Sequence, residues 1–433
     1  MNFSFFIAKK VAFGSKGSFS SYIILIAMTA VVLSISTMII AMSFIDGFQN
    51  EIRNKVFSFW GHVHIVPYSL SKTHHDVGIP SSTSFSNAKA LPYVKYLHSV
   101  VTKPCLMKSK TGFDGAVLKG VGEDYFLKNL NSFIVKGEML SNDSARVKQM
   151  VVSRSMAKRL NLAIDDKVIL HFPGKEIQTR ALRVKGIYET GVEEFDKEIA
   201  FTDISFLQEL NGWGNDTVSS FELKLEPQKM FKSKWKTYVM LFGGSLLSEE
   251  FYYELSKDPL DEMTYEINQQ IEESSMEAIA VKDIYPGLFD WLSLQNMNEL
   301  IIIILMILVA AINMISALLI FVLERTRMIG LLKSVGANDS SLMAIFLYYG
   351  LFVVVVGILL GNIIGVSLCL LQQQFHFIKL PMDSYYLSFA PISLSFWNIL
   401  FINIGTILLC FIALLLPLNV IRKINPVKTI QFD

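Results

Sequence analysis

Charged residues are missing from the longest apolar stretches of this sequence. A helix needs about 20 residues to cross a hydrocarbon core. Four stretches reach that length without a single Asp, Glu, Lys or Arg: Ser20–Phe44, Leu300–Leu323, Phe346–Leu371 and Phe396–Leu418. Transporters driven by protons or ions usually carry ionisable groups at membrane depth. The absence predicts that the energy for this protein's work comes from outside these helices.

Other classes of function are excluded by what the chain lacks. The sequence contains no G-x-x-x-x-G-K-[ST] motif, which excludes a P-loop ATPase on this chain. Of the three cysteines only Cys105 lies outside the apolar stretches, so no disulfide can form within the intervening domain. The net charge of +1 argues against a nucleic-acid partner. We find no catalytic constellation, and His62 and His64 lack the Cys or carboxylate partners that would complete a metal site.

Composition places the chain among membrane proteins that carry a sizeable polar domain. Hydrophobic residues make up 52% of the 433 residues and charged residues only 18%, where a soluble chain has about 25% charged residues. The first apolar stretch follows Lys9, Lys10 and Lys16, as in a signal peptide. It is too long for a leader and lacks a clean cleavage site, so we expect a retained helix.

The distribution of Lys and Arg near the helix ends predicts the orientation. Basic residues precede the first stretch, follow the second at Arg325, Arg327 and Lys333, and recur in the tail. The connection between the third and fourth stretches has only Lys379, although Arg53 and Lys55 are a contrary signal. We expect both termini in the cytoplasm and the large domain on the far side of the membrane.

The predicted fold is an α-helical membrane protein with four transmembrane helices and a large mixed α+β extracytoplasmic domain between helices 1 and 2. The expected segments, in order, are an interfacial segment 1–19, helix 20–44, domain 45–299 with an inserted lobe near 228–271, helix 300–323, a cytoplasmic segment 324–340, helix 341–371, loop 372–395, helix 396–418 and a tail 419–433.

Alternating apolar residues predict strands in the large domain. Candidate strands are Gly61–Tyr68, Ala116–Val121, Met150–Ser153 (with a helix after it across Arg154–Leu160), Val168–Phe172, Ala181–Tyr188 and Phe221–Leu225. Val168–Phe172 and Ala181–Tyr188 are expected to pair as a hairpin. Tyr285–Glu299 is predicted to be an amphipathic helix that continues into the second membrane helix.

The most specific local motif is Glu324–Ala337 (ERTRMIGLLKSVGA), directly after the second membrane stretch. It is short, basic and amphipathic, and Gly336 provides a helix stop. Physics alone favours an ordinary positive-inside loop. The segment nevertheless resembles the coupling segment of the FtsX/MacB/Lol class of ABC-transporter permeases, usually close to E-R-x-R-E-I-G-I-L-K-A-x-G-A. Met328 stands where that class has an acidic residue.

Further matches point to the lipoprotein-releasing LolC/LolE branch of that class. Phe6-Ile7-Ala8, Met42–Glu51 (MSFIDGFQNE), Val184–Phe201 (VKGIYETGVEEFDKEIAF) and Leu380–Ile392 (LPMDSYYLSFAPI) are similar to segments of that branch. The matches extend along nearly the whole chain except the inserted lobe. The resemblance implies a non-catalytic permease in the bacterial inner membrane that moves lipoproteins.

The resemblance also implies partners and contact residues. This chain would bind no cofactor; ATP and Mg would be held by a cytoplasmic ABC ATPase dimer. Further partners are a second permease, identical or paralogous, a periplasmic lipoprotein carrier, lipoprotein substrates and membrane lipid. The residues expected to contact the ATPase are Glu324, Arg325, Arg327, Ile329, Leu332, Lys333, Val335 and Gly336.

Three other groups of residues are candidates for function. A substrate cavity is expected along Met38, Met42, Phe44, Ile45, Phe48, Ile303 and Met306. Gly357, Gly361 and Gly365 share one helix face and permit close packing, either inside the subunit or at a dimer seam. In the LolC-like partner a long hairpin captures the carrier. Here the corresponding connection Phe172–Leu182 is short, so the hook is reduced, or another element receives the carrier, or this chain is the LolE-like partner. The candidate carrier contacts at its tip are Pro173, Gly174 and Lys175.

Two alternative functions remain open from the sequence. One is an FtsX-like transmembrane signalling scaffold that activates a cell-wall hydrolase, although such chains generally have a smaller outer domain. The other is MacB-like efflux, although such chains carry their ATPase fused at the N-terminus.

Overall fold

The computed structural model describes residues 19–68, 78–81, 91–122, 125, 130–140, 148–174, 176–226, 258–271, 276–381 and 385–423. The interfacial segment expected at 1–19, most of the lobe near 228–271 and the end of the tail lie outside these residues. The chain divides into two compact units: a helical unit (Met1–Gln49, Trp291–Lys379 and Phe389–Asp433) and a sheet unit (Asn50–Asp290 and Leu380–Ser388).

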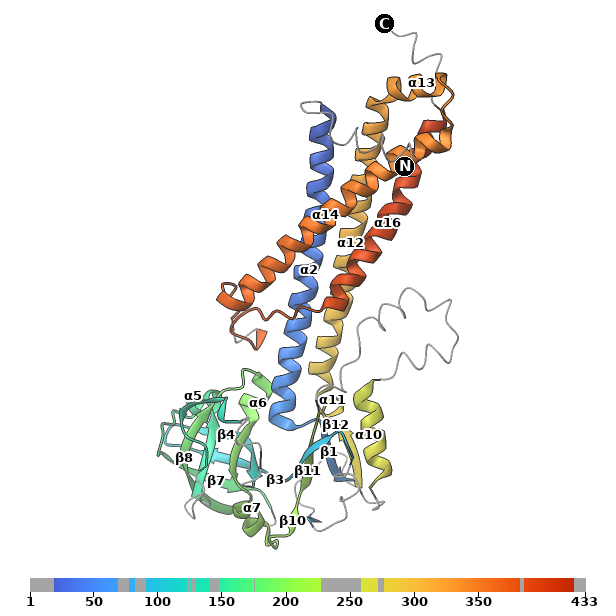
Figure 1. Cartoon of the computed structure of the whole chain (residues 1–433). Coiled ribbons are helices and arrows are strands. Elements are labelled where there is room, and N and C mark those ends of the chain that lie inside the picture. Colours follow the sequence, from blue (N-terminus) through green and yellow to red (C-terminus); the bar gives the residue numbers. More distant parts are fainter. Residues whose placement is uncertain are drawn as a thin grey trace. The chain divides into compact units, whose positions relative to one another are not determined.

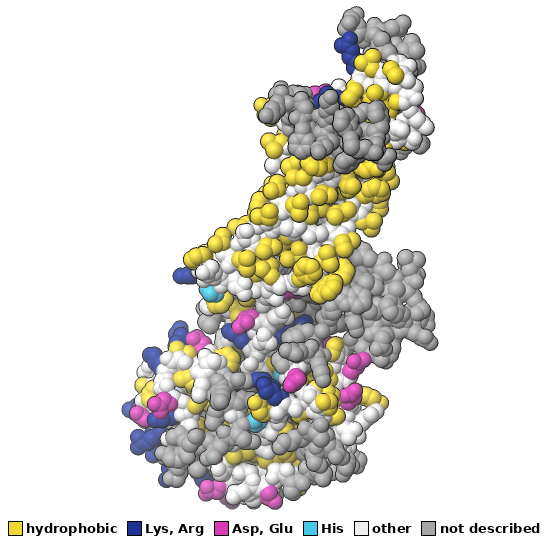
Figure 2. Space-filling view, in the orientation of Figure 1, with side chains coloured by type: hydrophobic (Ala, Val, Ile, Leu, Met, Phe, Trp, Pro, Cys, Tyr) yellow, Lys and Arg dark blue, Asp and Glu magenta, His cyan; other side chains and the backbone are white. Residues whose placement is uncertain are grey.

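Four helices of the described chain are long and apolar enough to cross a membrane (Figure 1). A helix satisfies all of its backbone hydrogen bonds internally, which hydrocarbon requires. Figure 2 shows hydrophobic side chains gathered over these helices, whereas charged side chains are spread over the sheet unit. The four helices are α2 (Phe19–Trp60), α12 (Pro286–Glu324), α14 (Asp339–Phe375) and α16 (Phe396–Lys423).

All four helices are longer than the apolar stretches that predict them, and α2 and α12 extend furthest beyond them. The first stretch ends at Phe44, but α2 continues without interruption to Trp60. The amphipathic segment predicted before the second stretch forms one continuous helix with it, because α12 runs from Pro286 to Glu324. Both helices therefore contribute residues to the helical unit and to the sheet unit.

The glycines of α14 lie against α2. A Cβ atom added at Gly361 would come within 2.8 Å of the Ile35 Cβ, and one at Gly357 within 2.8 Å of a Val31 methyl. An added Cβ at Gly365 would lie 3.1 Å from the Ser36 Cα. The close approach thus lies inside the subunit, which is one of the two arrangements that the glycine spacing permits.

A pair of amides joins α14 to α16. Asn362 and Asn403 donate to each other's side-chain oxygen, each at 3.2 Å. Amide pairs of this kind stabilise helix association in a membrane modestly, typically by about 0.6 kcal/mol.

Ten described strands form one mixed sheet in the sheet unit, in the order β12-β1-β11-β3-β4-β9-β6-β8-β5, with β7 pairing β3 and β8. Two further short strands, β2 (Ile79–Pro80) and β10 (Thr217–Val218), pair separately. The strands of the large sheet are β1 (Val63–Pro67), β3 (Val94–Lys108), β4 (Phe113–Val121), β5 (Ile134–Gly137), β6 (Gln149–Ser153), β7 (Lys167–Phe172), β8 (Gln178–Tyr188), β9 (Ile199–Asp203), β11 (Ser220–Leu225) and β12 (Met276–Ala280).

Short helices cover and connect these strands. They are α5 (Arg154–Arg159), α6 (Glu193–Glu198), α7 (Ile204–Asn211), α10 (Pro259–Gln269) and α11 (Val281–Ile284). The step from β6 into α5 occurs at Ser153, whose hydroxyl accepts a hydrogen bond from the Met156 amide at 3.0 Å. This N-cap satisfies a donor that has no partner inside the helix.

The predicted strands lie within or overlap β1, β4, β6, β7, β8 and β11, and β7 pairs with β8 as an antiparallel hairpin. The pairing reaches Phe172 opposite Gln178, so the turn is short. The longest strand, β3, was not predicted. Pro104 and several lysines interrupt its apolar pattern, and only pairing with β4, β11 and β7 reveals it.

We predict that Gly361→Ala weakens the packing of α14 on α2. The added methyl would overlap Ile35, and such overpacking costs about 1–3 kcal/mol. Gly405→Ala in α16 is the matched control, because a Cβ there meets nothing within 4 Å. The thermal unfolding midpoint of the purified chain should fall for Gly361→Ala and stay level or rise for Gly405→Ala. An unchanged midpoint for Gly361→Ala would contradict the close packing.

Candidate functional site

The predicted coupling segment forms a separate short helix, α13 (Thr326–Ser334), whose two faces differ in exposure. Leu331 is 53% exposed and Val335 is 87% exposed. Arg327 is also exposed, and its four-residue spacing places it on the same face as these two. On the other face Ile329 is fully buried. We call Arg327, Leu331 and Val335 the coupling face.

Two basic residues of the segment are engaged within the chain. The Lys333 ammonium lies 2.9 Å from the Asp339 carboxylate, and only 11% of the Lys333 side chain is exposed. This ion pair joins α13 to the first residue of α14, across a turn in which Gly336 adopts a φ of +93°. The Arg325 guanidinium lies 5.8 Å from the centre of the Phe321 ring.

The residues expected to contact the ATPase therefore differ in how exposed their side chains are. Glu324, Arg327, Val335 and Gly336 are exposed, Arg325, Leu332 and Lys333 are partly covered, and Ile329 is buried. Leu331 was missed. The sequence does not distinguish the adjacent Leu331 and Leu332. Which of the two side chains faces outward depends on where α13 begins, and that residue, Thr326, is known only from the structure.

The residues expected to line a substrate cavity are packed among the helices of this chain. Met38, Met42, Ile45, Phe48 and Ile303 are each less than a tenth exposed, while Phe44 and Met306 are partly covered. The Phe48 ring meets the edge of Trp291 at a centroid distance of 5.6 Å. Exposure of these side chains to a substrate would therefore require the helices to move or to separate.

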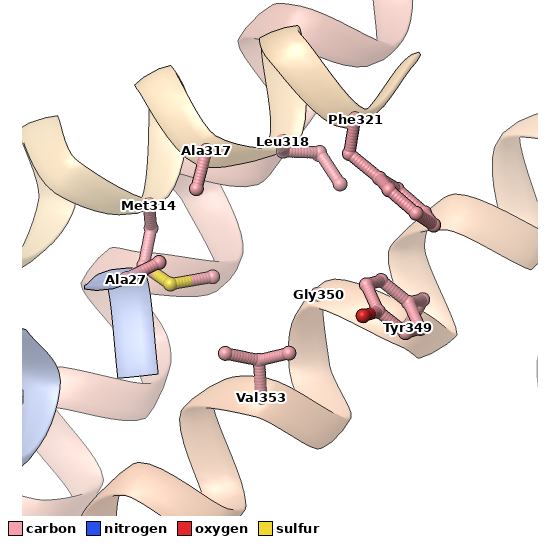
Figure 3. Close-up of a pocket in the computed structure, with 8 residues that line it drawn as sticks. All are labelled: Ala27, Met314, Ala317, Leu318, Phe321, Tyr349, Gly350 and Val353. Atoms are coloured by element: carbon pink, nitrogen blue, oxygen red, sulfur yellow. The ribbon is translucent and has the colours of Figure 1, made fainter. Parts of the chain in front are cut away.

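A small cavity of about 10 Å³ lies elsewhere among the same helices (Figure 3). In the close-up Met314 and Phe321 on α12 face Tyr349 and Val353 on α14, and Ala27 of α2 completes the wall. The Phe321 and Tyr349 rings stack at 4.4 Å. The predicted lining residues do not contribute to this cavity.

Polar side chains connect α2 to α12 and to α16 near the ends of their apolar stretches. The Asn398 amide donates to the Asp46 carboxylate at 2.7 Å. The Gln49 amide donates to the Asn296 side chain at 2.9 Å and to the Leu292 carbonyl at 3.0 Å. Inspection of the apolar stretches alone misses this network, because its members on α2 and α12 lie outside the predicted spans.

Aromatic side chains surround the end of α2 in the sheet unit. Phe59 is fully buried, stacks on Phe195 at 5.1 Å and meets Phe201 edge-on at 5.3 Å. The Trp60 ring lies 5.6 Å from Tyr285, directly before α12. Aromatic pairs of this geometry add about 0.5–1.5 kcal/mol each beyond the area they bury.

The two histidines beside β1 are hydrogen-bonded inside the sheet unit. The His62 Nδ1 accepts the Leu225 amide at 3.0 Å, and the His64 Nε2 lies 2.8 Å from the Trp60 carbonyl. Burial lowers the pKa of His62 to about 3, with a further lowering from the positive charge of Lys224. Burial also lowers the pKa of His64. Both rings serve the fold as neutral hydrogen-bonding groups.

The tip of the β7–β8 hairpin is exposed. Pro173 and Gly174 are exposed, and Lys175 lies outside the described residues. Ile177, next to the tip, is 73% exposed and was not among the candidates.

The buried His62 makes stability depend on pH. Its folded pKa lies below the unfolded value of 6.5, so its contribution is complete above pH 6.5 and is lost as pH falls toward 3. The loss is about 1 kcal/mol per pH unit. We predict that His62→Asn, which keeps an acceptor near Nδ1 but does not titrate, flattens the fall of the unfolding midpoint between pH 6.5 and 4.5. An identical slope in both proteins, measured by tryptophan fluorescence, would contradict this.

Comparison with known proteins matches both parts of the chain. The MacB-like periplasmic core domain model matches residues 24–232, and the FtsX-like permease C-terminal model matches residues 300–426. The "Lipoprotein-releasing system transmembrane protein LolC" of Buchnera aphidicola subsp. Schizaphis graminum is 22% identical over 96% of this chain and 94% of that protein. LolC of Xylella fastidiosa (strain Temecula1) is 20% identical, with 96% of each chain covered.

A LolE protein also matches this chain along its whole length. The "Lipoprotein-releasing system transmembrane protein LolE" of Haemophilus influenzae is 22% identical over 100% of this chain and 100% of that protein. Similarity to LolC and LolE therefore spans nearly all of the sequence. It includes both of the regions that the two family models match. The chain thus matches a MacB-like periplasmic core domain followed by an FtsX-like permease C-terminal domain, and along nearly its whole length it is similar to the LolC and LolE permeases.

Proposed function

We propose that this chain is the permease subunit of an ABC transporter that extracts lipoproteins from the bacterial inner membrane and passes them to a periplasmic carrier. The observation that carries the proposal is the similarity to LolC and LolE over at least 96% of the chain. Those relatives are named for a lipoprotein-releasing system. Because the similarity includes both domains, it supports the whole assembly rather than one module.

The proposed topology has α2, α12, α14 and α16 as four membrane spans, both termini in the cytoplasm and the sheet unit in the periplasm. The positive-inside rule supports it, because Arg325, Arg327 and Lys333 follow the second span. The segment between the third and fourth spans contains a single basic residue, Lys379.

The energy source in this proposal is a separate cytoplasmic ABC ATPase dimer, which binds ATP and Mg. The coupling face of α13 supports such a contact, because Leu331 and Val335 expose apolar surface beside the basic Arg327. An apolar patch with a polar rim is typical of a protein-binding surface. Closure of the ATPase dimer would bias α13, and with it α12 and α14, between two arrangements.

Extraction of a lipoprotein requires a shielded path for its acyl chains. Each CH₂ group that leaves the bilayer costs about 0.8 kcal/mol, so three chains amount to tens of kcal/mol. We place that path between this chain and a second permease, identical or paralogous, along Met38, Met42, Phe44, Ile45, Phe48, Ile303 and Met306. Because most of these side chains are buried, the path opens only when α2 and α12 shift.

Delivery to the carrier is assigned to the β7–β8 hairpin. The exposed tip at Pro173 and Gly174, together with Lys175 and the exposed Ile177, is the proposed contact. The hairpin is shorter than the hook of LolC-like partners, so its apolar tip would rest on the carrier surface.

The proposal is tested by depleting this protein and locating mature lipoproteins by membrane fractionation. We expect them to accumulate in the inner membrane. Normal lipoprotein sorting with defective cell-wall cleavage would overturn the proposal in favour of an FtsX-like signalling scaffold. Normal sorting with loss of resistance to secreted toxic compounds would instead favour MacB-like efflux.

We predict that Leu331→Asp and Val335→Asp weaken binding of the ATPase subunit. Loss of an interface hot spot costs about 2 kcal/mol or more, which corresponds to roughly 30-fold in affinity. Tyr265→Asp in α10 is the matched control, because its side chain is 65% exposed in the sheet unit. Binding is measured by co-purification and by titrating the ATPase subunit against each variant. Only the Leu331→Asp and Val335→Asp variants should bind it more weakly. Equal affinity for all three variants would exclude the coupling face as the contact.

A further inference from the structure

The two helices that connect the units lead into neighbouring strands of the sheet. α2 ends at Trp60 and β1 begins at Val63, while β12 ends at Ala280 and is followed by α11 and α12. β1 and β12 are antiparallel neighbours, and the Val281 amide donates to the His62 carbonyl at 2.9 Å. Along the backbone, only two residues therefore separate the end of α2 from the first strand of the sheet.

That link contains a potential hinge. Gly61 adopts a φ of +74°, in the left-handed region that glycine enters without strain. A single glycine after a 42-residue helix would let the helix pivot unless other contacts fix its end. The question is what holds the last turn of α2.

The Phe59 carbonyl, in the last turn of α2, is held by Lys119 of β4 and by Tyr125, which follows β4 in the chain. The Phe59 carbonyl accepts from the Tyr125 hydroxyl at 3.1 Å and from the Lys119 ammonium at 3.5 Å. Terminal carbonyls of a helix have no partner within the helix and carry its partial negative charge. A cation and a hydroxyl at this position therefore act as a C-terminal cap.

The cap is anchored across three strands. Lys119 on β4 and Glu222 on β11, with β3 between them, pair at 2.7 Å, and both side chains are 0% exposed. The Tyr125 hydroxyl has a single proton, which the Phe59 carbonyl shares with the Glu222 carboxylate 2.8 Å from the hydroxyl oxygen. The Lys119 ammonium lies 4.1 Å from the centre of the Trp60 ring. Burial lowers the pKa of Lys119, an effect that the Glu222 carboxylate opposes.

We infer that Lys119 and Glu222 are positioning residues that lock the end of α2 to the sheet, so that movement of α2 turns the sheet instead of bending at Gly61. The transport consequence of this inference rests on the proposed function. In that setting, the lock carries the ATP-driven shift of the membrane helix to the domain that meets the carrier.

Stability alone does not account for this arrangement. Replacing a buried ion pair by apolar residues of similar size is often neutral or stabilising. An apolar pair in the sheet could fill the same space, but it could not bond the Phe59 carbonyl or attract the face of the Trp60 ring. The charged pair therefore adds a polar connection between helix and sheet, beside those that Tyr125 and His64 make with the Phe59 and Trp60 carbonyls.

The test uses Lys119→Met/Glu222→Leu, which removes both charges together and avoids leaving one charge buried alone. Lys282→Met is the matched control, because Lys282 pairs with Asp258 and Asp261 in the same unit, with 21% of its side chain exposed. Both variants and the parent chain are purified with their ATPase and second permease in lipid nanodiscs. Hydrogen exchange of residues 50–65, ATPase rate and lipoprotein released per ATP are then measured.

We expect the double variant to exchange about tenfold faster across residues 50–65, as loss of about 1.4 kcal/mol of local stability predicts. The backbone amides of β6 and β8 should stay protected from hydrogen exchange. ATP hydrolysis should continue, and the amount of lipoprotein released per ATP should fall about tenfold. The Lys282→Met control should match the parent in all three measurements.

Two results would overturn the inference. Unchanged exchange across residues 50–65 would show that the pair does not hold the end of α2. Faster exchange with unchanged release per ATP would show that the lock does not transmit movement. If the parent complex releases no lipoprotein at all, the proposed function fails, while hydrogen exchange still decides whether Lys119 and Glu222 hold the helix.

Discussion

A helix that leaves a membrane and ends inside a folded domain must satisfy its last carbonyl groups there. In this protein α2 ends against a mixed sheet, and its Phe59 carbonyl is met by Lys119 and Tyr125. The lysine is fully buried and remains compatible with the core because Glu222 lies 2.7 Å away. The four apolar stretches contain no charge, and this buried ion pair lies outside them, beside the end of the first helix.

This constraint explains why the two units are connected as they are. α2 and α12 attach to adjacent strands, β1 and β12, and aromatic residues fill the space around the end of α2. At the other end of α12, the short helix α13 exposes Leu331 and Val335 while burying Ile329. Along the chain, the continuous helix α12 thus lies between α11, which follows β12, and the separate helix α13 with its coupling face.

The sequence predicted the four apolar helices well, because long uncharged stretches have few alternative folds. It also predicted the β7–β8 hairpin and the class of permease from motifs spread along the chain. It did not reveal β3, since Pro104 and the lysines obscure its pattern. Lys119 appeared only as a lysine in a weakly alternating strand. Its partner is more than 100 positions away, and the contact arises from strand order, which local patterns do not encode.

The central claim is tested most directly by reconstituting this chain, its second permease and its ATPase into lipid vesicles that contain a labelled lipoprotein. The carrier is added outside, and the labelled lipoprotein in the soluble fraction is measured with and without ATP. Our account predicts transfer to the carrier only when ATP is hydrolysed. Lipoprotein that stays in the vesicles while ATP is consumed would contradict a role in release.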